Sequence, residues 1–327
     1  MAQAEKCGIA VAGTVIVDRI NEIGAYPAIG ELTQITGLQK AIGGCVPNVA
    51  LDLKRIDPNL SVRAFGRIGQ DADGIFVQET LAQGGVDIDG LIVSETEPTS
   101  FTEVMSVSGG QRTFFTYAGA SAGFGVEDVD FGAQLPKLLH LGYFLLLQKV
   151  DAGDGLEILK AAQAQGVRTS IDLVSESSDR YALVLPCLPY TDYLIINELE
   201  AGKLTGMIPE NGNLQAIAQR LLDLGVREKV ILHKPDCAVC MSRDGFTWVA
   251  SYALPDGYIK GTTGAGDAFC AGALLGIYRG WTDREILEFA SATAVMALGS
   301  ADATSGLLEA QAIRDFCSRF SRQSVIL

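Results

Sequence analysis

The segment from Gly264 to Asp267 carries the clearest chemical signal in the 327-residue sequence. A Gly264-Ala265-Gly266 turn leads into residues 267–278, which are small and apolar with helical spacing. Glycines allow consecutive backbone N–H groups to point at one spot, and the positive end of the helix dipole adds to them. The segment predicts an anion hole for a phosphoryl group, with Asp267 beside it to accept a proton from an attacking hydroxyl. The alternative from these residues alone is an ordinary glycine-rich helix start with an aspartate in its usual place.

Two common phosphate-binding motifs do not fit this segment. A P-loop beginning at Gly261 would need a lysine where Asp267 stands. A dinucleotide fingerprint beginning at Gly264 would need a third glycine where Phe269 stands, and it would follow the first strand of the chain. The phosphate chemistry of the segment is therefore of another kind.

The elements that position this turn follow an alternating order. Short apolar runs predict buried strands, and segments with helical spacing between them predict helices. Such alternation predicts an α/β fold, with a mostly parallel sheet covered by helices on both faces. The expected strands are residues 9–17, 62–68, 137–147, 167–172, 193–196 and 229–232, and the expected helices are residues 47–55, 75–83, 155–165, 214–224, 267–278 and 286–298.

Two regions break the alternation. Residues 18–42 and 99–118 have β-type composition with no helical pattern between their apolar stretches. They predict a small antiparallel β insertion that serves as a lid. No linker separates them from the rest, so the expectation is one α/β domain over residues 1–327.

Composition excludes several classes of protein. The formal net charge is −14, which argues against nucleic acid and membranes as main partners, because both require basic patches. The seven cysteines are odd in number, and Cys237 and Cys240 have few histidines available to complete a zinc site. Reduced thiols packed as small apolar residues fit better, and we expect a cytoplasmic protein.

Three motifs together resemble the ribokinase-like (PfkB) carbohydrate kinases. The C-terminal signature is Gly264-Ala265-Gly266-Asp267, and Asn197-Glu198-Leu199-Glu200 resembles the N-x-x-E motif of the family. The N-terminal block is Gly43-Gly44-x-x-x-Asn48, followed by Gly66-x-Ile68-Gly69-x-Asp71-x-x-Gly74. The order and spacing match over essentially the whole chain, and the predicted insertion resembles the β lid of the family.

The resemblance implies a set of catalytic and nucleotide-binding roles. Asp267 would be the general base, and the backbone N–H groups of Gly264, Ala265 and Gly266 would stabilise the transferring phosphoryl group. Asn197 and Glu200 would position Mg²⁺ against the phosphates of ATP, mostly through water. Without the other motifs, these two residues would indicate only a turn and a solvated helix start.

The resemblance also implies contacts to the substrate. Asp18, Gly43, Gly44 and Asn48 would bind the sugar, and Arg112 in the lid would reach it from above. The ordinary alternatives are a strand-ending turn residue for Asp18 and an exposed strand charge for Arg112. Ala294 would lie beside the adenine, with close helix packing as its alternative role.

The sequence departs from the family pattern at several positions. Gly261 replaces an aspartate that helps to hold K⁺ in the members that this ion activates, so K⁺ activation is left open. Residues 234–238 replace the glycines of the usual nucleotide loop, which leaves the phosphate donor open. Residues 172–176 lack the D-x-N-x-R pattern of several sugar-kinase groups, and Ser121 stands where Gly-Ala-Asn is usual.

The sequence therefore predicts an ATP-dependent kinase that phosphorylates a primary hydroxyl of a small sugar or polyol. A nucleoside kinase of the same family is the first alternative, and a phosphosugar kinase with Lys40, Arg63 or Arg112 at its phosphate is the next. A non-catalytic sugar or nucleotide sensor is the alternative outside enzymes, although a sensor has no use for a base at Asp267. A homodimer through the lid is expected from the family alone.

Overall fold

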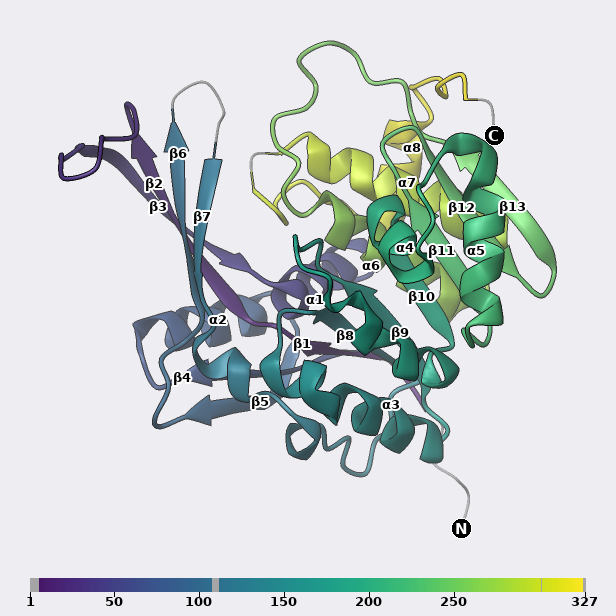
Figure 1. The fold of residues 1–327 in the computed structure, drawn as a ribbon, viewed down its shortest axis with the longest axis horizontal. Helices are drawn as coiled ribbons and strands as arrows, with labels where there is room; N and C mark the ends of the chain where they lie inside the picture. The colour runs from purple at the N-terminus through teal and green to yellow at the C-terminus, as the bar shows by residue number, and fades with distance from the viewer. Residues whose placement is uncertain (1–5, 108–111, 301, 326–327) are drawn as a thin grey trace.

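Nine strands form the central sheet of the computed structural model, which describes residues 6–107, 112–300 and 302–325 (Figure 1). They are β1 (Ile9–Gly13), β4 (Val62–Gly69), β5 (Asp87–Ser94), β8 (Leu138–Phe144), β9 (Arg168–Leu173), β10 (Tyr193–Asn197), β11 (Lys229–His233), β12 (Cys237–Ser242) and β13 (Gly245–Ala250). Their order is β13-β12-β11-β10-β9-β8-β1-β4-β5. The seven strands from β11 to β5 are parallel, and β12 and β13 add an antiparallel edge.

Helices cover both faces of this sheet, as the alternation predicts. Along β1, Ile9 and Val11 face one apolar core, whereas Ala10 and Ala12 face the other. The first core is covered by α1 (Cys45–Ile56), α2 (Ala72–Gln83), α6 (Ala265–Arg279), α7 (Asp283–Leu298) and α8 (Ala310–Cys317). The second core is covered by α3 (Gly155–Ala164), α4 (Glu198–Thr205) and α5 (Leu214–Asp223).

A second sheet forms from the two regions that were predicted to be an insertion. Its strands are β2 (Ile16–Ile23), β3 (Ile35–Gly43), β6 (Phe101–Val107) and β7 (Arg112–Tyr117), in the order β3-β2-β6-β7. Both outer pairs are antiparallel, and the central β2–β6 pair is parallel. Figure 1 shows this second sheet extending away from the main body at the side of α1 and α2.

Residues 9–17 form two strands and not the single strand that the sequence predicts. The break follows Gly13, which has φ of 135°, and a Cβ at Gly13 would lie 2.5 Å from the carbonyl oxygen of Gly142. This close approach ends β1, and after Thr14 and Val15 the chain joins the second sheet as β2. One apolar run therefore supplies a strand to each sheet.

The antiparallel edge was missed by the sequence analysis. β12 and β13 form a hairpin that turns at Arg243 and Asp244, and β13 begins at Gly245, which has φ of 116°. Cys237 and Cys240 both lie on β12 and are buried, but Cys237 belongs to one core and Cys240 to the other. Each thiol therefore packs as a small apolar group on its own face of the sheet.

None of the helices in the described part of the chain has the length and apolar character needed to cross a membrane.

Candidate active site

A pocket of about 180 Å³ lies where the carboxyl ends of β8, β9, β10 and β11 meet the start of α6. Open α/β sheets bind their ligands at this edge. Three carboxylates line the pocket, those of Asp172, Glu200 and Asp267, and its lining residues include no lysine or arginine. The pocket thus combines an excess of negative charge with the glycine-rich turn.

Asp267 is buried in the first turn of α6 and is held by two neutral donors. The side-chain amide of Asn48 donates to Oδ2 at 2.8 Å, and the hydroxyl of Tyr143 lies 3.1 Å from Oδ1 and 3.0 Å from Oδ2. Burial, and then the negative charge of Asp172, raise the pKa of Asp267 to about 7. A carboxyl with this pKa can take up and release a proton near neutral pH, as a general base must.

The turn before Asp267 requires glycine at its first position. Gly264 has φ of 78°, and a Cβ there would lie 2.5 Å from the Cα of Ala303. Within the turn, the N–H of Ala265 donates to the carbonyl oxygen of Thr262 at 3.3 Å. One of the three expected phosphoryl-binding N–H groups is therefore used inside the loop, and a ligand would have to compete for it.

The expected sugar-binding residues at the start of the chain lie together. Asp18 on β2 covers Gly43 at the end of β3, where a Cβ would lie 2.7 Å from the Asp18 carboxylate. Gly44 precedes α1 with φ of 86°, and a Cβ there would lie 2.6 Å from the carbonyl oxygen of Thr14. Burial raises the pKa of Asp18 to about 6, and its charge contributes to the raised pKa of Asp267.

Asn48 has a different immediate partner from the one expected. Its side-chain N–H group is used on Asp267, while its Oδ1 is buried and has no hydrogen-bond partner among the described residues. Buried acceptors of this kind are normally paired. Asn48 can therefore hold the Asp267 carboxylate with one end and accept a hydrogen bond from a ligand hydroxyl with the other.

Asn197 and Glu200 form a reciprocal cap at the start of α4. Asn197 Oδ1 accepts from the Glu200 N–H at 2.9 Å, and the Glu200 carboxylate accepts from the Asn197 N–H at 3.0 Å. Glu200 also accepts from the hydroxyl of Ser175 at 2.7 Å. Burial raises the pKa of Glu200 to about 7. Asn197 and Glu200 therefore do cap α4, which is the ordinary role for such residues. The carboxylates of the adjoining pocket still have no lysine or arginine beside them in its lining.

The donor set of this pocket fits Mg²⁺. Magnesium binds carboxylate oxygens and keeps several of its waters. Burial has raised the pKa values of Asp267 and Glu200, and the pocket lining contains no lysine or arginine to oppose it. A hydrated divalent cation would supply that missing positive charge, and Glu200 and Asn197 are placed to contact its water shell.

The second sheet reaches the glycine-rich turn through Arg112. Its guanidinium donates to the hydroxyl of Thr263 at 3.3 Å, and Arg112 itself is exposed. The contact joins β7 to the loop that precedes α6. Arg112 therefore lies close to the expected phosphoryl-binding turn.

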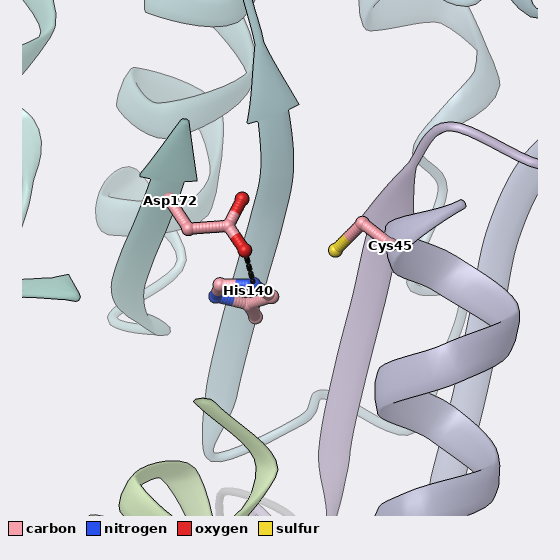
Figure 2. A group of neighbouring side chains, drawn as sticks. All are labelled: Cys45, His140 and Asp172. Carbon is pink, nitrogen blue, oxygen red and sulfur yellow. Dashed lines mark ion pairs between the residues drawn. The ribbon is translucent and has the colours of Figure 1, made fainter. Parts of the chain in front are cut away.

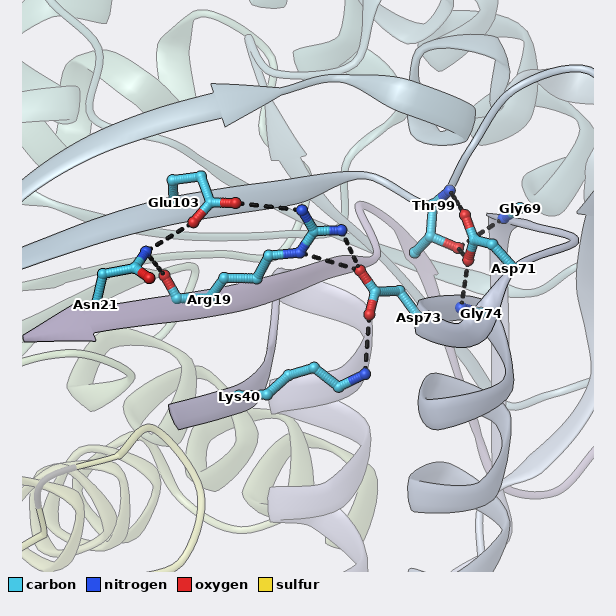
Figure 3. A network of polar contacts seen from close by, with 9 residues as sticks. All are labelled: Arg19, Asn21, Lys40, Gly69, Asp71, Asp73, Gly74, Thr99 and Glu103. Carbon is cyan, nitrogen blue, oxygen red and sulfur yellow. Dashed lines mark hydrogen bonds and ion pairs between the residues drawn. The ribbon is translucent and has the colours of Figure 1, made fainter. Parts of the chain in front are cut away.

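Two polar clusters fix the second sheet to the main body (Figure 3). In the first, the buried carboxylate of Asp73 at the start of α2 pairs with Arg19 at 2.6 Å and Lys40 at 2.8 Å, and Arg19 also pairs with Glu103. Because Arg19 is on β2 and Lys40 on β3, one carboxylate holds both strands. The cation of the proposed phosphosugar site at Lys40 is thus already paired.

The second cluster explains part of the N-terminal signature. Asp71 caps α2 by accepting from the Gly74 N–H at 2.8 Å, and it also accepts from the N–H and hydroxyl of Thr99 at 2.8 and 2.7 Å. The N–H of Gly69 donates to the same Thr99 hydroxyl at 2.9 Å. These residues of the signature hold the entry to β6 and have a structural role.

Figure 2 shows a further group of side chains, one of which, Asp172, accepts from the N–H of the Tyr143 that contacts Asp267. Ligand atoms of Cys45, His140 and Asp172 all lie within 4.8 Å of one another, and all three residues are buried. His140 Nε2 is 3.4 Å from an oxygen of Asp172, whose other oxygen accepts from the N–H of Tyr143 at 2.6 Å. Burial raises the pKa of the Cys45 thiol well above its usual value, so this thiol stays protonated.

The two positions that the sequence associates with the nucleotide, Ala294 and residues 234–238, lie in ordinary structural surroundings. Ala294 lies on α7, half-buried against the first core and outside the pocket lining. In the loop that replaces the glycine pattern, Lys234 pairs with Asp236 at 3.0 Å. Tyr143 and His233 also line the pocket, but no short motif marks them, and the sequence predicts no site role for either.

Comparison with known proteins agrees with this geometry. A model of the pfkB family of carbohydrate kinases matches residues 8–310. The chain is 28% identical over 291 residues to a ribokinase of Arabidopsis thaliana, which covers 88% of this chain and 74% of that protein. It is 24% identical over 298 residues to a 5-dehydro-2-deoxygluconokinase of Clostridium perfringens strain 13, which covers 88% of this chain and 87% of that protein.

Solved structures share the fold. A structure of Arabidopsis thaliana ribokinase, complexed with ribose and ATP, gives a TM-score of 0.80 at 22% identity, covering 96% of this chain and 99% of that one. A ribokinase structure from Thermotoga maritima gives a TM-score of 0.79 at 20% identity, covering 95% and 99%. The predicted ribokinase-like fold is confirmed, and the chain belongs to the PfkB family of carbohydrate kinases, as a sugar-phosphorylating phosphotransferase.

Proposed function

We propose that this sugar kinase transfers the γ-phosphoryl group of ATP to a primary hydroxyl of a small sugar or polyol, with Asp267 as the general base. The observation that carries the proposal is the placement of a buried carboxyl with a pKa of about 7 directly after the Gly264–Gly266 turn. ATP use draws support from relatives of the same fold that were solved with ATP or ADP bound.

The reaction follows from the positions of the side chains. The acceptor hydroxyl donates a hydrogen bond to Asp267, and its oxygen forms a bond to the γ-phosphorus as Asp267 takes its proton. The bond from the γ-phosphorus to the bridging oxygen breaks, and ADP leaves with that electron pair. The N–H groups of the turn and the start of α6 stabilise the negative charge of the transferring group.

Mg²⁺, when bound, would neutralise part of the phosphate charge in this acidic pocket. Glu200 and Asn197 are the residues of this chain that would hold it, through its water molecules. Arg112 on the second sheet would add one positive charge above the turn. With Gly261 in place of the aspartate of K⁺-activated members, we expect little dependence on K⁺.

The acceptor site favours an uncharged polyol. The Asp18 carboxylate and the unpartnered Asn48 Oδ1 can each accept a hydrogen bond from a sugar hydroxyl. Gly43 lets the ring approach the backbone beside Asp18. Lys40 is paired with Asp73 and Arg63 with Asp87, so neither cation is free for a second phosphate group.

Homodimerisation through the second sheet is part of the proposal. Leu38 on β3 and the side chains of Phe115 and Tyr117 on β7, which the strand register places on one face of the sheet, are between 44% and 76% exposed. Burying such an apolar surface against a second copy would be favourable. We expect light scattering to give a particle of twice the chain mass of 34.6 kDa.

A cytoplasmic location is also part of the proposal, because reduced cysteines are typical of that compartment and all seven cysteines are free.

The test is a screen for acceptor-dependent release of ADP from Mg-ATP, with and without K⁺. The panel contains pentoses, hexoses, polyols, keto-acids, nucleosides and phosphosugars, and phosphorus NMR identifies the ester formed. Turnover of one uncharged sugar or polyol supports the proposal. Turnover of a nucleoside or phosphosugar alone would overturn the substrate class, and ligand binding without turnover of any acceptor would indicate a sensor.

A further inference from the structure

The backbone at the end of β8 adopts an unusual conformation beside the base. Tyr143 has φ of 61° and Leu145 has φ of 76°, and these are the residues other than glycine with positive φ in the described ranges. Side chains rarely adopt this left-handed region, and such residues cluster at functional sites. At Tyr143 the conformation is accompanied by a direct contact between its hydroxyl and Asp267.

Buried polar groups hold Tyr143 in this conformation. Its N–H donates to Asp172 Oδ1 at 2.6 Å, and the other oxygen of Asp172 lies 3.4 Å from His140 Nε2. The remaining ring nitrogen of His140 lies 3.1 Å from the hydroxyl of Ser170. Figure 2 shows the Asp172 carboxylate directed at His140 from the neighbouring strand. The chain of contacts runs from β9 through β8 to the tyrosine, so Tyr143 is fixed from behind.

We propose that Tyr143 is a positioning residue for phosphoryl transfer: its hydroxyl holds the Asp267 carboxylate, and the Asp172–His140 pair holds Tyr143 for that contact. This inference rests on the proposed role of Asp267 as the base. Asn48 donates to Oδ2 and Tyr143 lies within hydrogen-bond distance of both oxygens, so the carboxylate cannot rotate freely. An acceptor hydroxyl would meet it in one orientation, which is the condition for efficient proton transfer.

The direction of proton donation is set by the surroundings. Burial, and then the negative charge of Asp267, raise the pKa of Tyr143 well above its usual value, so the phenol keeps its proton and donates it. A donated hydrogen bond favours the ionised carboxylate and lowers the pKa of Asp267, whereas the charge of Asp172 raises it. Tyr143 and Asp172 therefore act on the base with opposite sign.

Other titratable groups face Asp267, and substitution of Tyr143 or Asp172 leaves these groups in place. Asp18 on β2 contributes further negative charge around it, whereas burial raises the pKa of Asp52 on α1 well above its usual value and keeps that carboxyl neutral. The thiols of Cys45 and Cys270 have pKa values raised well above the usual one and stay neutral. Burial lowers the pKa of His233 to about 4, so it too is neutral at the pH of the assay.

The test is the pH dependence of kcat/KM with the acceptor found in the ADP-release screen. In the wild type, activity should rise with pH through about 7, the pKa of Asp267. Tyr143→Phe removes the donated hydrogen bond, so the midpoint should move up by about one pH unit and activity below it should fall about tenfold. Asp172→Asn keeps an acceptor for the Tyr143 N–H but removes the charge, so the midpoint should move down.

Two further variants separate the possible outcomes. Tyr193→Phe is the matched control, because the hydroxyl of the buried Tyr193 accepts from Arg168 at 2.6 Å and bonds no other residue that the structure describes, so its midpoint should stay at the wild-type value. If Asp267→Asn remains active, the proposed function and this inference both fail. If Asp267→Asn is inactive but the Tyr143→Phe and Asp172→Asn profiles superimpose on the wild type, only the role of Tyr143 is overturned.

Discussion

The side-chain amide of Asn48 donates a 2.8 Å hydrogen bond to the carboxylate of Asp267, across 219 residues of sequence. Asn48 lies in the first turns of α1 and Asp267 in the first turn of α6, and these two helices pack against each other. The N-terminal and C-terminal signatures thus meet at one hydrogen bond. A change in the N-terminal signature should consequently alter the ionisation of the Asp267 carboxylate directly.

Asn48→Asp tests this relationship. It replaces the donor with a second carboxyl at hydrogen-bond distance, and two such groups cannot both ionise easily, so the pKa of Asp267 rises further. We expect kcat/KM at pH 7 to fall at least a hundredfold and to recover partly at higher pH. Asn59→Asp adds the same charge on an exposed loop and should leave the rate unchanged. Equal rates for wild type and Asn48→Asp at pH 7 would refute the coupling.

Gly43→Ala should damage acceptor binding. The new Cβ would lie 2.7 Å from the Asp18 carboxylate, which must then move from its place above the backbone. We expect the KM for the acceptor to rise at least tenfold, with a smaller change in the KM for ATP. Gly37→Ala on the same strand is the control, since it meets only the flexible end of Glu22. An unchanged acceptor KM in Gly43→Ala would remove Asp18 from the acceptor site.

Asp73→Ala should loosen the second sheet. The variant leaves Arg19 and Lys40 without the carboxylate that holds both strands to α2. We expect acceptor kcat/KM to fall about tenfold through KM, because the second sheet would close less accurately over the pocket. Glu157→Ala breaks a surface pair with Lys160 and is the matched control. If both variants behave alike in steady-state kinetics, the pairing at Asp73 has no part in catalysis.

Asp52 gives a prediction about stability. It is fully buried on α1 with no hydrogen-bond partner for either oxygen in the described part of the chain, and burial raises its pKa well above the usual value. Its folded pKa therefore exceeds its unfolded one, so its contribution to stability is complete below about pH 4 and is lost progressively as the pH rises. The wild type should lose up to about 1.4 kcal/mol per pH unit from this group.

Asp52→Asn removes that titration and preserves the shape of the side chain. Its melting temperature should exceed that of the wild type by a margin that grows between pH 5 and pH 8. Asp89 is exposed on β5, so Asp89→Asn is the control. Its melting temperature should differ from that of the wild type by the same amount at pH 5 and at pH 8. Thermal unfolding measured at pH 5 and at pH 8 checks this prediction. If the melting temperatures of Asp52→Asn and the wild type differ by the same amount at both pH values, Asp52 ionises freely in the folded protein.

The extent of the sequence prediction follows from the kind of signal that each residue carries. Asp267, Gly264 and Gly43 belong to short motifs whose composition is set by the backbone and by the chemistry, and Asp18 directly follows the first apolar run, so their positions could be expected. Tyr143 acts from a conformation that no dipeptide signals, because contacts with Asp172 on another strand impose it. Pairings between distant segments have no local pattern in one sequence.

The strand boundaries show the same limit. The apolar run of residues 9–17 predicts one strand because hydrophobicity alone does not indicate which sheet a strand joins. The break depends on the contact of Gly13 with Gly142, two residues on neighbouring strands. The β12–β13 hairpin was missed because its fully buried strand β12 has no alternation of polar and apolar residues.

The role of Asp267 is tested most directly by acceptor-dependent release of ADP in wild type and Asp267→Asn at saturating Mg-ATP. The asparagine keeps the size of the side chain and can still pair with Asn48 and Tyr143, but it cannot take the proton of the acceptor hydroxyl. We predict that kcat falls about 10²–10⁴-fold while the variant retains its affinity for ATP and its melting temperature. A kcat within a few-fold of the wild type would contradict Asp267 as the general base.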